Sequence, residues 1–291
     1  MSSHRVRLVL HGGAGALPRR DYGRELTHMR GLIEAGRDRL SAGALALDVV
    51  VETIAALEAS GLYIAGKGAS PNRAGVYEHD TSLMEGRGRR AGAVAAFVGF
   101  RSPIKAARAV MERTPHVLLA GAGAAAFAAE QGLERIDHPD AWFTPAWRDA
   151  GMNETGATVG TVGCLALDES GALAAGTSTG GTYGKLPGRV GDTPIPGAGV
   201  WADDAVAVSC TGAGEMFIRA AVAAQIAHRL RFGGETLSQA ARAALEEARS
   251  LGGEGGLISL SAHGEISMPY NTQGMKRAAL GAGGAISAEV F

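Results

Sequence analysis

Apolar positions along this chain recur with two different periods, and the change of period separates expected helices from expected strands. Residues 24–40 carry apolar side chains at helical spacing, and residues 46–59 do so more clearly. Gly61 follows the second of these stretches and predicts its end. A short apolar run at 5–10 indicates a buried first strand, ended by the sequence HGGAGA at 11–16.

Three pairs of β-compatible runs are each joined by a short loop that contains glycine. The pairs are 78–86 with 90–99, 161–168 with 172–179, and 256–262 with 265–269. Such loops predict hairpins, and hairpins make antiparallel sheets. Alanine-rich helical stretches lie at 103–114, 121–131 and 215–250. Helices grouped around antiparallel sheet indicate a layered α+β fold. The stretch 138–160 has no sustained period and indicates a loop or linker.

The composition describes a globular protein without an electrostatic or membrane signature. The chain has 291 residues, 46% apolar and 20% charged, which excludes disorder, and a net charge of -1 gives no case for nucleic acid or an anionic membrane. No uncharged apolar run approaches the ~18 residues of a membrane span, and the first apolar stretch is too short for a signal peptide. Cys164 and Cys210 form no disulfide framework and lie in apolar runs, so we expect buried thiols and a cytoplasmic protein.

Several common chemistries lack a convincing signature. The segment GAGAAA at 121–126 fits a dinucleotide-binding pattern, with Asp137 and Asp140 where a ribose-binding acid would fall. Such a match arises easily among 44 glycines, and the hairpins argue against the parallel sheet it requires. The sequence holds no HExxH zinc motif and no GxSxG nucleophile elbow. His11, beside two glycines, is best interpreted as a hydrogen-bonded loop residue rather than a metal ligand.

Threonines near glycine runs suggest nucleophilic catalysis by a hydroxyl. The threonines of this kind are Thr158, Thr161, Thr177, Thr179, Thr182 and Thr211. Thr161 follows Gly160 and opens a β-run after the irregular linker. A break between these two residues would give Thr161 a free α-amine, which could act as the base for its own hydroxyl. Strand propensity and turn chemistry explain the same threonines without any catalysis.

Anchors for a small polar substrate lie further along the chain. Arg189 and Asp192 stand three residues apart in LPGRVGDTP, where together they match the carboxylate and the ammonium of an α-amino acid. The same spacing would also suit a local surface ion pair. In CTGAGE at 210–215, Thr211 and consecutive backbone N–H groups suit an oxyanion hole, a helix cap, or both.

Seven motifs follow one another along nearly the whole chain. They are HGGAGA at 11–16, the helix and loop at 46–68, GTVG at 160–163, TSTGG at 177–181, KLPGRVGDTP at 185–194, SCTGAGE at 209–215 and PYNTQGM at 269–275. Together they resemble the plant-type L-asparaginase/isoaspartyl aminopeptidase family. The resemblance implies hydrolysis of β-aspartyl dipeptides and L-asparagine with release of L-aspartate. It also implies one N-terminal nucleophile hydrolase domain over 1–291, a four-layer αββα sandwich of two antiparallel sheets between helical layers.

The resemblance further implies that the precursor cleaves itself between Gly160 and Thr161, into an α subunit 1–160 and a β subunit 161–291. By the same resemblance, the catalytic groups are the nucleophile Thr161, the orienting hydroxyl of Thr179, and an oxyanion hole made by Thr211 and Gly212. The implied substrate-binding residues are Arg189 for the α-carboxylate, Asp192 and Gly214 for the α-ammonium, and Gly181.

No cofactor for catalysis is implied, but a structural sodium ion is. Its implied ligands are the backbone carbonyls of Leu57, Glu58, Ser60, Tyr63, Ala65 and Lys67, and a loop of oxygen donors suits a hard cation. The resemblance also implies a homodimer of αβ units that takes a small molecule or dipeptide as substrate, with no nucleic-acid or membrane partner.

The chain departs from the family pattern in three places. Ile64 stands where relatives have the Asn of an FNAG motif, near the active site, which bears on water placement or rate. The usual ELDAS strand has the sequence EHDTS at 78–82, with Glu85 following, and the linker before Thr161 is short, which bears on the speed of self-cleavage. Two other readings of the resemblance stay open: a threonine amidase for another substrate, such as glycosylated asparagine, and a non-processing relative that only binds amino acids or peptides.

Overall fold

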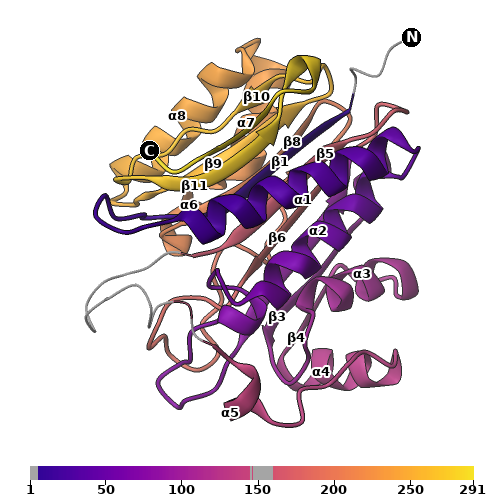
Figure 1. The fold of residues 1–291 in the computed structure, drawn as a ribbon, viewed down its shortest axis with the longest axis vertical. Coiled ribbons are helices and arrows are strands. Elements are labelled where there is room, and N and C mark those ends of the chain that lie inside the picture. Colours follow the sequence, from indigo (N-terminus) through magenta and orange to yellow (C-terminus); the bar gives the residue numbers. More distant parts are fainter. Residues whose placement is uncertain (1–5, 145, 147–159) are drawn as a thin grey trace.

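Two facing β-sheets form the centre of the molecule, whose computed structural model describes residues 6–144, 146 and 160–291 (Figure 1). The larger sheet has the strand order β12-β11-β1-β5-β6-β2-β3-β4, and the smaller one has the order β10-β9-β8-β7. The strands of the larger sheet are β1 Arg7–Ala14, β2 His79–Glu85, β3 Ala91–Phe97, β4 Leu118–Ala120, β5 Val162–Leu167, β6 Leu173–Thr179, β11 Met275–Leu280 and β12 Ile286–Glu289. Those of the smaller sheet are β7 Val200–Ala202, β8 Val206–Gly212, β9 Gly255–Ser261 and β10 Ile266–Ser267.

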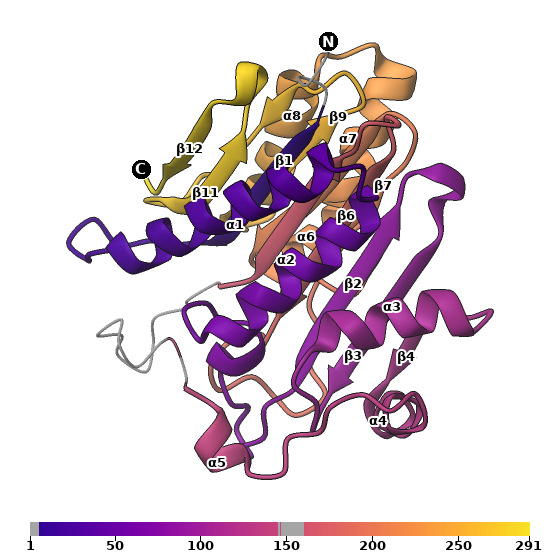
Figure 2. The same ribbon diagram turned by 45° about the vertical axis from the view of Figure 1, so that its right-hand side comes forward.

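Helices cover the outer face of each sheet and complete four layers. On the larger sheet lie α1 Gly23–Ser41, α2 Ala46–Ser60, α3 Pro103–Arg113 and α4 Gly121–Glu130, and on the smaller sheet lie α6 Gly214–Ala220, α7 Val222–Gly233 and α8 Leu237–Ser250 (Figures 1 and 2). Short helical turns occur at α5 Pro139–Trp142, η1 Gly66–Gly68, η2 Arg87–Arg89 and η4 Ala282–Gly284. Within the described ranges, none of the helices combines the length and apolarity needed to cross a membrane. The layered α+β sandwich expected from the sequence is therefore confirmed.

The alternation of side chains along a strand explains why both faces of the larger sheet are buried. In β5, Val162, Cys164 and Ala166 pack under α1 and α2, while Leu165 and Leu167 point into the space between the sheets. A third apolar cluster lies between the smaller sheet and helices α6–α8. Both cysteines are buried and free, as expected.

The structure corrects several details of the sequence-based prediction. The larger sheet is not wholly antiparallel, because β3 and β4 pair in parallel, and α3 connects them. The first strand does not end at the HGGAGA sequence but runs through it to Ala14, because β11 pairs with it across a bulge. The helical stretch expected at 215–250 is divided into three helices, at Ala221 in the left-handed region (φ 47°) and at the turn after Gly233. Of the linker 138–160, residues 145 and 147–159 lie outside the described part.

Segments on both sides of Gly160–Thr161 share one sheet. Strands β5 and β6, which follow this bond, lie between β1 and β2, which precede it, and β11 pairs with the other edge of β1. Neither segment could leave without breaking central backbone ladders. The products of a cleavage here would therefore remain associated.

Candidate active site

Polar side chains replace apolar ones at one end of the space between the two sheets. Odd-numbered positions of β1 and β5 point into this space, as Val9 and Leu165 show, and the same alternation applies to β6 and β8. The polar residues at the inward-facing positions are His11, Thr161, Thr177, Thr179, Ser209 and Thr211. The two facing sheets thus gather hydroxyl groups from three separate segments: the residue just before β5, the end of β6 and the end of β8.

Thr161 and Thr179 lie opposite each other across β5 and β6. Val162 pairs with Ser178 in these antiparallel strands, so the residue before Val162 faces the residue after Ser178. Both threonines line a small cavity of about 10 Å³. The cavity is lined by Gly160, Thr161, Thr179, Gly181, Thr182, Arg189, Gly191, Asp192, Thr193 and Gly212. The structure therefore brings together seven of the expected site residues around one point.

The carbonyl of Ile64 and the loop after β6 fix the hydroxyl of Thr179. This hydroxyl donates to Ile64 O at 3.5 Å and accepts from Gly181 N at 3.0 Å, and Gly180 N donates to the same carbonyl at 2.8 Å. Gly181 has φ +75°, a conformation that side-chain-bearing residues rarely adopt. Ile64, at the position where the chain departs from the family pattern, thus contributes its backbone to the site.

His11 connects Thr161 to the smaller sheet. Its Nδ1 lies 3.1 Å from Thr161 O, and its Nε2 lies 2.9 Å from Ser209 Oγ. Burial lowers the pKa of His11 to about 3, so the ring is neutral. Because a carbonyl can only accept, Nδ1 carries the proton and Nε2 accepts from Ser209. Ser209 Oγ in turn accepts from Thr177 Oγ1 at 2.7 Å. The sequence predicted a hydrogen-bonded His11, although on a loop rather than in β1.

Thr211 and Gly212 end β8 beside this cavity. The Thr211 hydroxyl accepts from Ala14 N at 3.3 Å, which leaves its own hydrogen available for another acceptor. Helix α6 begins at Gly214 with Ala213 as its N-cap residue and without a side-chain cap, so the cap interpretation of Thr211 is wrong. Ala213 N donates to Glu254 O at 2.8 Å.

Arg189 projects toward the same site from the loop between β6 and β7. Its Nε and Nη2 both lie 2.9 Å from the carboxylate of Glu215, so Arg189 forms its ion pair with Glu215. The local ion pair with Asp192 that their spacing would also suit is not formed. Two buried carboxylates hold the loop, because Gly188 N donates to Glu78 at 2.9 Å and Gly191 N donates to Asp80 at 3.1 Å. The sequence analysis noted the segment 78–82 only as a departure from a family pattern. No signal in the sequence indicated that its carboxylates hold the loop that carries Arg189.

Asp192 is buried with an unsatisfied oxygen. Its Oδ2 has no hydrogen-bond partner among the described residues, and burial raises the pKa of this carboxyl from 3.8 to about 7. A β-carbon added to Gly214 would lie 3.0 Å from both Asp192 Oδ1 and Arg189 Nη2. The two side chains therefore converge on Gly214, although they make no ion pair with each other. A buried acceptor without a donor is costly, so this arrangement suits a cationic ligand.

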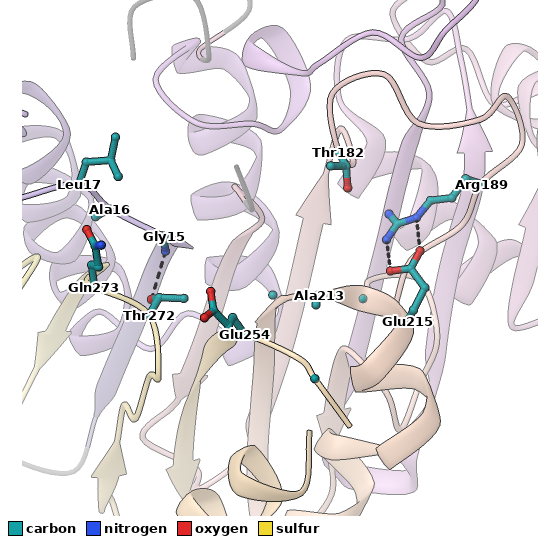
Figure 3. Close-up of a pocket in the computed structure, with 13 residues that line it drawn as sticks. Gly15, Ala16, Leu17, Thr182, Arg189, Ala213, Glu215, Glu254, Thr272 and Gln273 are labelled. Atoms are coloured by element: carbon teal, nitrogen blue, oxygen red, sulfur yellow. Dashed lines mark hydrogen bonds and ion pairs between the residues drawn. The ribbon is translucent and has the colours of Figure 1, made fainter. Parts of the chain in front are cut away.

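A larger pocket of about 540 Å³ adjoins the cavity and shares Thr182, Arg189 and Gly212 with it (Figure 3). Its remaining lining residues are Gly15, Ala16, Leu17, Ala213, Gly214, Glu215, Gly252, Glu254, Thr272 and Gln273. Figure 3 shows the Arg189–Glu215 pair at one end and Leu17, Thr272 and Gln273 at the other. The pocket can hold a ligand considerably longer than an amino-acid head group.

Carbonyl groups crowd the loop after α2, where the sodium ligands were expected. A β-carbon added to Gly66 would lie 2.4 Å from Glu58 O, and one added to Gly68 would lie 2.1 Å from Tyr63 O. The Glu58 carboxylate points elsewhere and accepts from Ser102, Ile104 N and Ser178. Among the described residues, His, Cys, Asp and Glu side chains form no group of three or more that could hold a metal ion.

Comparison with known proteins gives one consistent result. The sequence profile described as Asparaginase matches residues 4–288. The chain is 46% identical to an isoaspartyl peptidase of Salmonella typhimurium, over 93% of this chain and 94% of that protein. It is 45% identical to an isoaspartyl peptidase of Escherichia coli, over 93% and 91%, and 39% identical to a plant-type L-asparaginase of Pyrobaculum calidifontis, over 93% and 95%.

Proposed function

The chain belongs to the asparaginase family, and on that premise we propose that it is a self-processing threonine hydrolase that cleaves β-aspartyl dipeptides and L-asparagine. One observation carries the proposal: Gly160–Thr161 lies in a cavity that also holds Thr179, Gly212, Arg189 and Asp192. The names of its relatives favour these two substrates over the alternative of glycosylated asparagine.

The proposed reaction uses the hydroxyl and the α-amine of Thr161 after the Gly160–Thr161 bond is cleaved. The hydroxyl oxygen attacks the side-chain amide carbonyl of the substrate while the amine takes its proton. Donors at Thr211 and Gly212 stabilise the resulting oxyanion. The amide C–N bond then breaks, the amine returns the proton to the leaving group, and an ester of Thr161 remains. Water hydrolyses this ester and releases L-aspartate.

Arg189 and Asp192 are proposed to select a free α-amino-acid head group. Glu215 occupies the Nε–Nη2 edge of Arg189, so the Nη1–Nη2 edge remains for the substrate carboxylate in a two-bond geometry. The substrate ammonium would supply the donor that Asp192 Oδ2 lacks. Gly214 suits this site because it adds no side chain between these two groups, and Gly181 lines the same cavity.

Self-cleavage is proposed to use the same hydroxyl, which attacks the carbonyl carbon of Gly160. The Gly160–Thr161 C–N bond then breaks and its nitrogen takes up the hydroxyl proton to become the free amine, and water hydrolyses the resulting ester between Gly160 and the Thr161 side chain. The intact mass of the denatured protein, followed over days, tests this step: two species matching 1–160 and 161–291 are expected. Cleaved protein should release aspartate from L-asparagine and from β-Asp-Leu. The variant Thr161→Ala should show neither cleavage nor turnover. A single uncleaved mass in the unaltered protein, without turnover, would contradict the proposal and favour the binding-protein interpretation.

A structural sodium ion forms part of the proposal. The backbone carbonyls of Leu57, Glu58, Ser60, Tyr63, Ala65 and Lys67 would hold it, and the close approach of carbonyls to Gly66 and Gly68 supports an oxygen-lined loop. Leu57, Glu58 and Ser60 lie in the last turn of α2, where carbonyls lack intrahelical partners. The ion would stabilise this loop, from which Ile64 O reaches Thr179.

The proposed assembly is a homodimer of αβ units, and the proposed location is the cytoplasm. Family resemblance supports the dimer, and the two buried free thiols are consistent with a reducing compartment. Light scattering on the cleaved protein should give about twice the chain mass of 29.6 kDa. A mass near that of one chain would contradict the dimer.

A further inference from the structure

The larger pocket contains a carboxylate that the proposed mechanism does not use. Glu254 lies between α8 and β9, and its side chain projects into the pocket between Ala213 and Thr272 (Figure 3). Its carboxylate makes no ion pair or hydrogen bond with the residues that the structure describes. Its backbone carbonyl is held by Ala213 N at 2.8 Å, so the residue is anchored beside Gly212.

The order of the groups along the pocket indicates which part of a bound substrate would lie beside Glu254. Arg189 and Asp192 would take the head group at one end, and Thr161 and Gly212 lie next to it. The group that leaves must then extend into the remaining space, which Leu17, Glu254 and Gln273 line. An amino acid leaving from a β-aspartyl dipeptide would therefore place its side chain near Glu254.

The charges around this space do not cancel. Arg189 and Glu215 neutralise each other in their two-bond ion pair, and Gln273 is neutral. Glu254 is then the one uncompensated charge among the residues that line this pocket. Leu17, 43% exposed, adds an apolar surface at the end of the pocket away from Arg189. An aliphatic stem that ends in a positive charge fits such a surface better than a neutral or acidic side chain does.

Building on the proposed function, we propose that Glu254 determines leaving-group specificity and makes the enzyme prefer β-aspartyl dipeptides whose second residue is cationic. The reaction at Thr161 is unchanged, and the effect arises from attraction between Glu254 and the departing side chain. Because Glu254 is exposed, we expect a modest effect that salt reduces, since the Debye length falls to ~3 Å at 1 M ionic strength.

The test compares kcat/KM of the cleaved enzyme for β-Asp-Lys, β-Asp-Gln, β-Asp-Glu and L-asparagine. We expect the order Lys, Gln, Glu, with about a tenfold difference between the first and the last, expressed mainly in KM. Glu254→Gln should reduce this ratio to within twofold of one, and Glu254→Lys should invert it. L-asparagine, whose leaving group is ammonia, should change by less than twofold in either variant. Glu34→Gln, the same charge change at an exposed position of α1, is the matched control and should keep the tenfold ratio.

Three results would overturn the inference. A Lys-to-Glu ratio near one in the unaltered enzyme, or an unchanged ratio in Glu254→Gln, would show that Glu254 does not act on the leaving group. An equal rise of KM for L-asparagine and β-Asp-Lys in Glu254→Gln would assign Glu254 to the head-group site instead. Failure to hydrolyse any of the four substrates would refute the proposed function and, with it, this inference, whereas hydrolysis without charge preference refutes only the inference.

Discussion

Gly160 is packed so closely that adding one methyl group should slow self-cleavage. A β-carbon at position 160 would lie 2.4 Å from Ile64 Cγ1 and 2.5 Å from both Ile64 Cβ and Ile64 Cδ1. Carbon atoms prefer separations of about 3.5–4.0 Å, so all three contacts are at least about 1 Å too short. Rotating the Ile64 side chain does not relieve the contact with its Cβ. The backbone there is held by the hydrogen bond from Gly180 N to Ile64 O, 2.8 Å.

The expected cost of Gly160→Ala follows from this overlap. Overpacking of this kind costs roughly 1–3 kcal/mol. If that strain displaces the scissile carbonyl from the Thr161 hydroxyl, cleavage should slow by about 5- to 150-fold. The assay is the time course of the intact mass, from which the fraction cleaved between residues 160 and 161 is obtained at each time.

A second substitution distinguishes this steric cause from a general loss of folding. Ile64→Gly removes all three contacts and should restore the cleavage rate of Gly160→Ala, and Ile64→Ala, which keeps the β-carbon, should restore it only in part. Once cleaved, the Gly160→Ala enzyme should hydrolyse L-asparagine at the normal rate per cleaved molecule. Cleavage of Gly160→Ala at the unaltered rate would refute the reasoning. Slow cleavage of the double variant Gly160→Ala/Ile64→Gly, together with normal cleavage of Ile64→Gly alone, would also refute it.

Three further predictions concern Asp192, Glu58 and the proposed sodium site. Asp192, with its pKa raised to about 7 by burial, must be ionised to bind the substrate ammonium, and the Thr161 α-amine, whose pKa is ordinarily near 7.7–8.0, must be neutral to act as a base. A plot of log kcat/KM for L-asparagine against pH should therefore approach a slope of two on the acid side, and a slope of one would contradict this. Burial raises the pKa of Glu58 from 4.5 to about 7, so the stability that its protonated form contributes is present below pH 4.5 and is lost as the pH rises through 7, by roughly 3 kcal/mol. Urea unfolding of the uncleaved variant Thr161→Ala should show this loss of stability, and Glu58→Gln in that background should not. Parallel pH profiles for the two variants would refute the assignment. Replacing sodium by choline should lower the Tm of the cleaved protein. Gly68→Ala, whose β-carbon would lie 2.1 Å from Tyr63 O, should abolish that response, whereas Gly31→Ala, whose β-carbon would meet open space, should keep it. An unchanged Tm in choline would contradict the sodium site.

Local patterns predicted much of the architecture because each is contained within a few neighbouring residues. The helical spacing of 46–59 and the positive φ at Gly61 (72°) belong to one element and its end, and the structure has α2 there. The hairpins at 78–99 and 161–179 are likewise local, since a short glycine-containing loop fixes which strands pair. The prediction was wrong at β1, where β11, distant in sequence, pairs with the HGGAGA segment and extends the strand.

The sequence by itself determined the chemistry available to this protein: a glycine before a threonine, further threonines beside glycine runs, and an arginine and an aspartate three residues apart. Only the tertiary structure decided how these groups meet. The register of β5 and β6 places Thr161 opposite Thr179, and the facing of two sheets brings Ser209 to His11. The same packing pairs Arg189 with Glu215 rather than with its neighbour Asp192, and among the described residues it leaves Asp192 Oδ2 without a hydrogen-bond donor. The physical reason is that contacts between distant segments depend on strand register and layer packing, which involve the whole core, whereas spacing along the chain records only what neighbouring residues do.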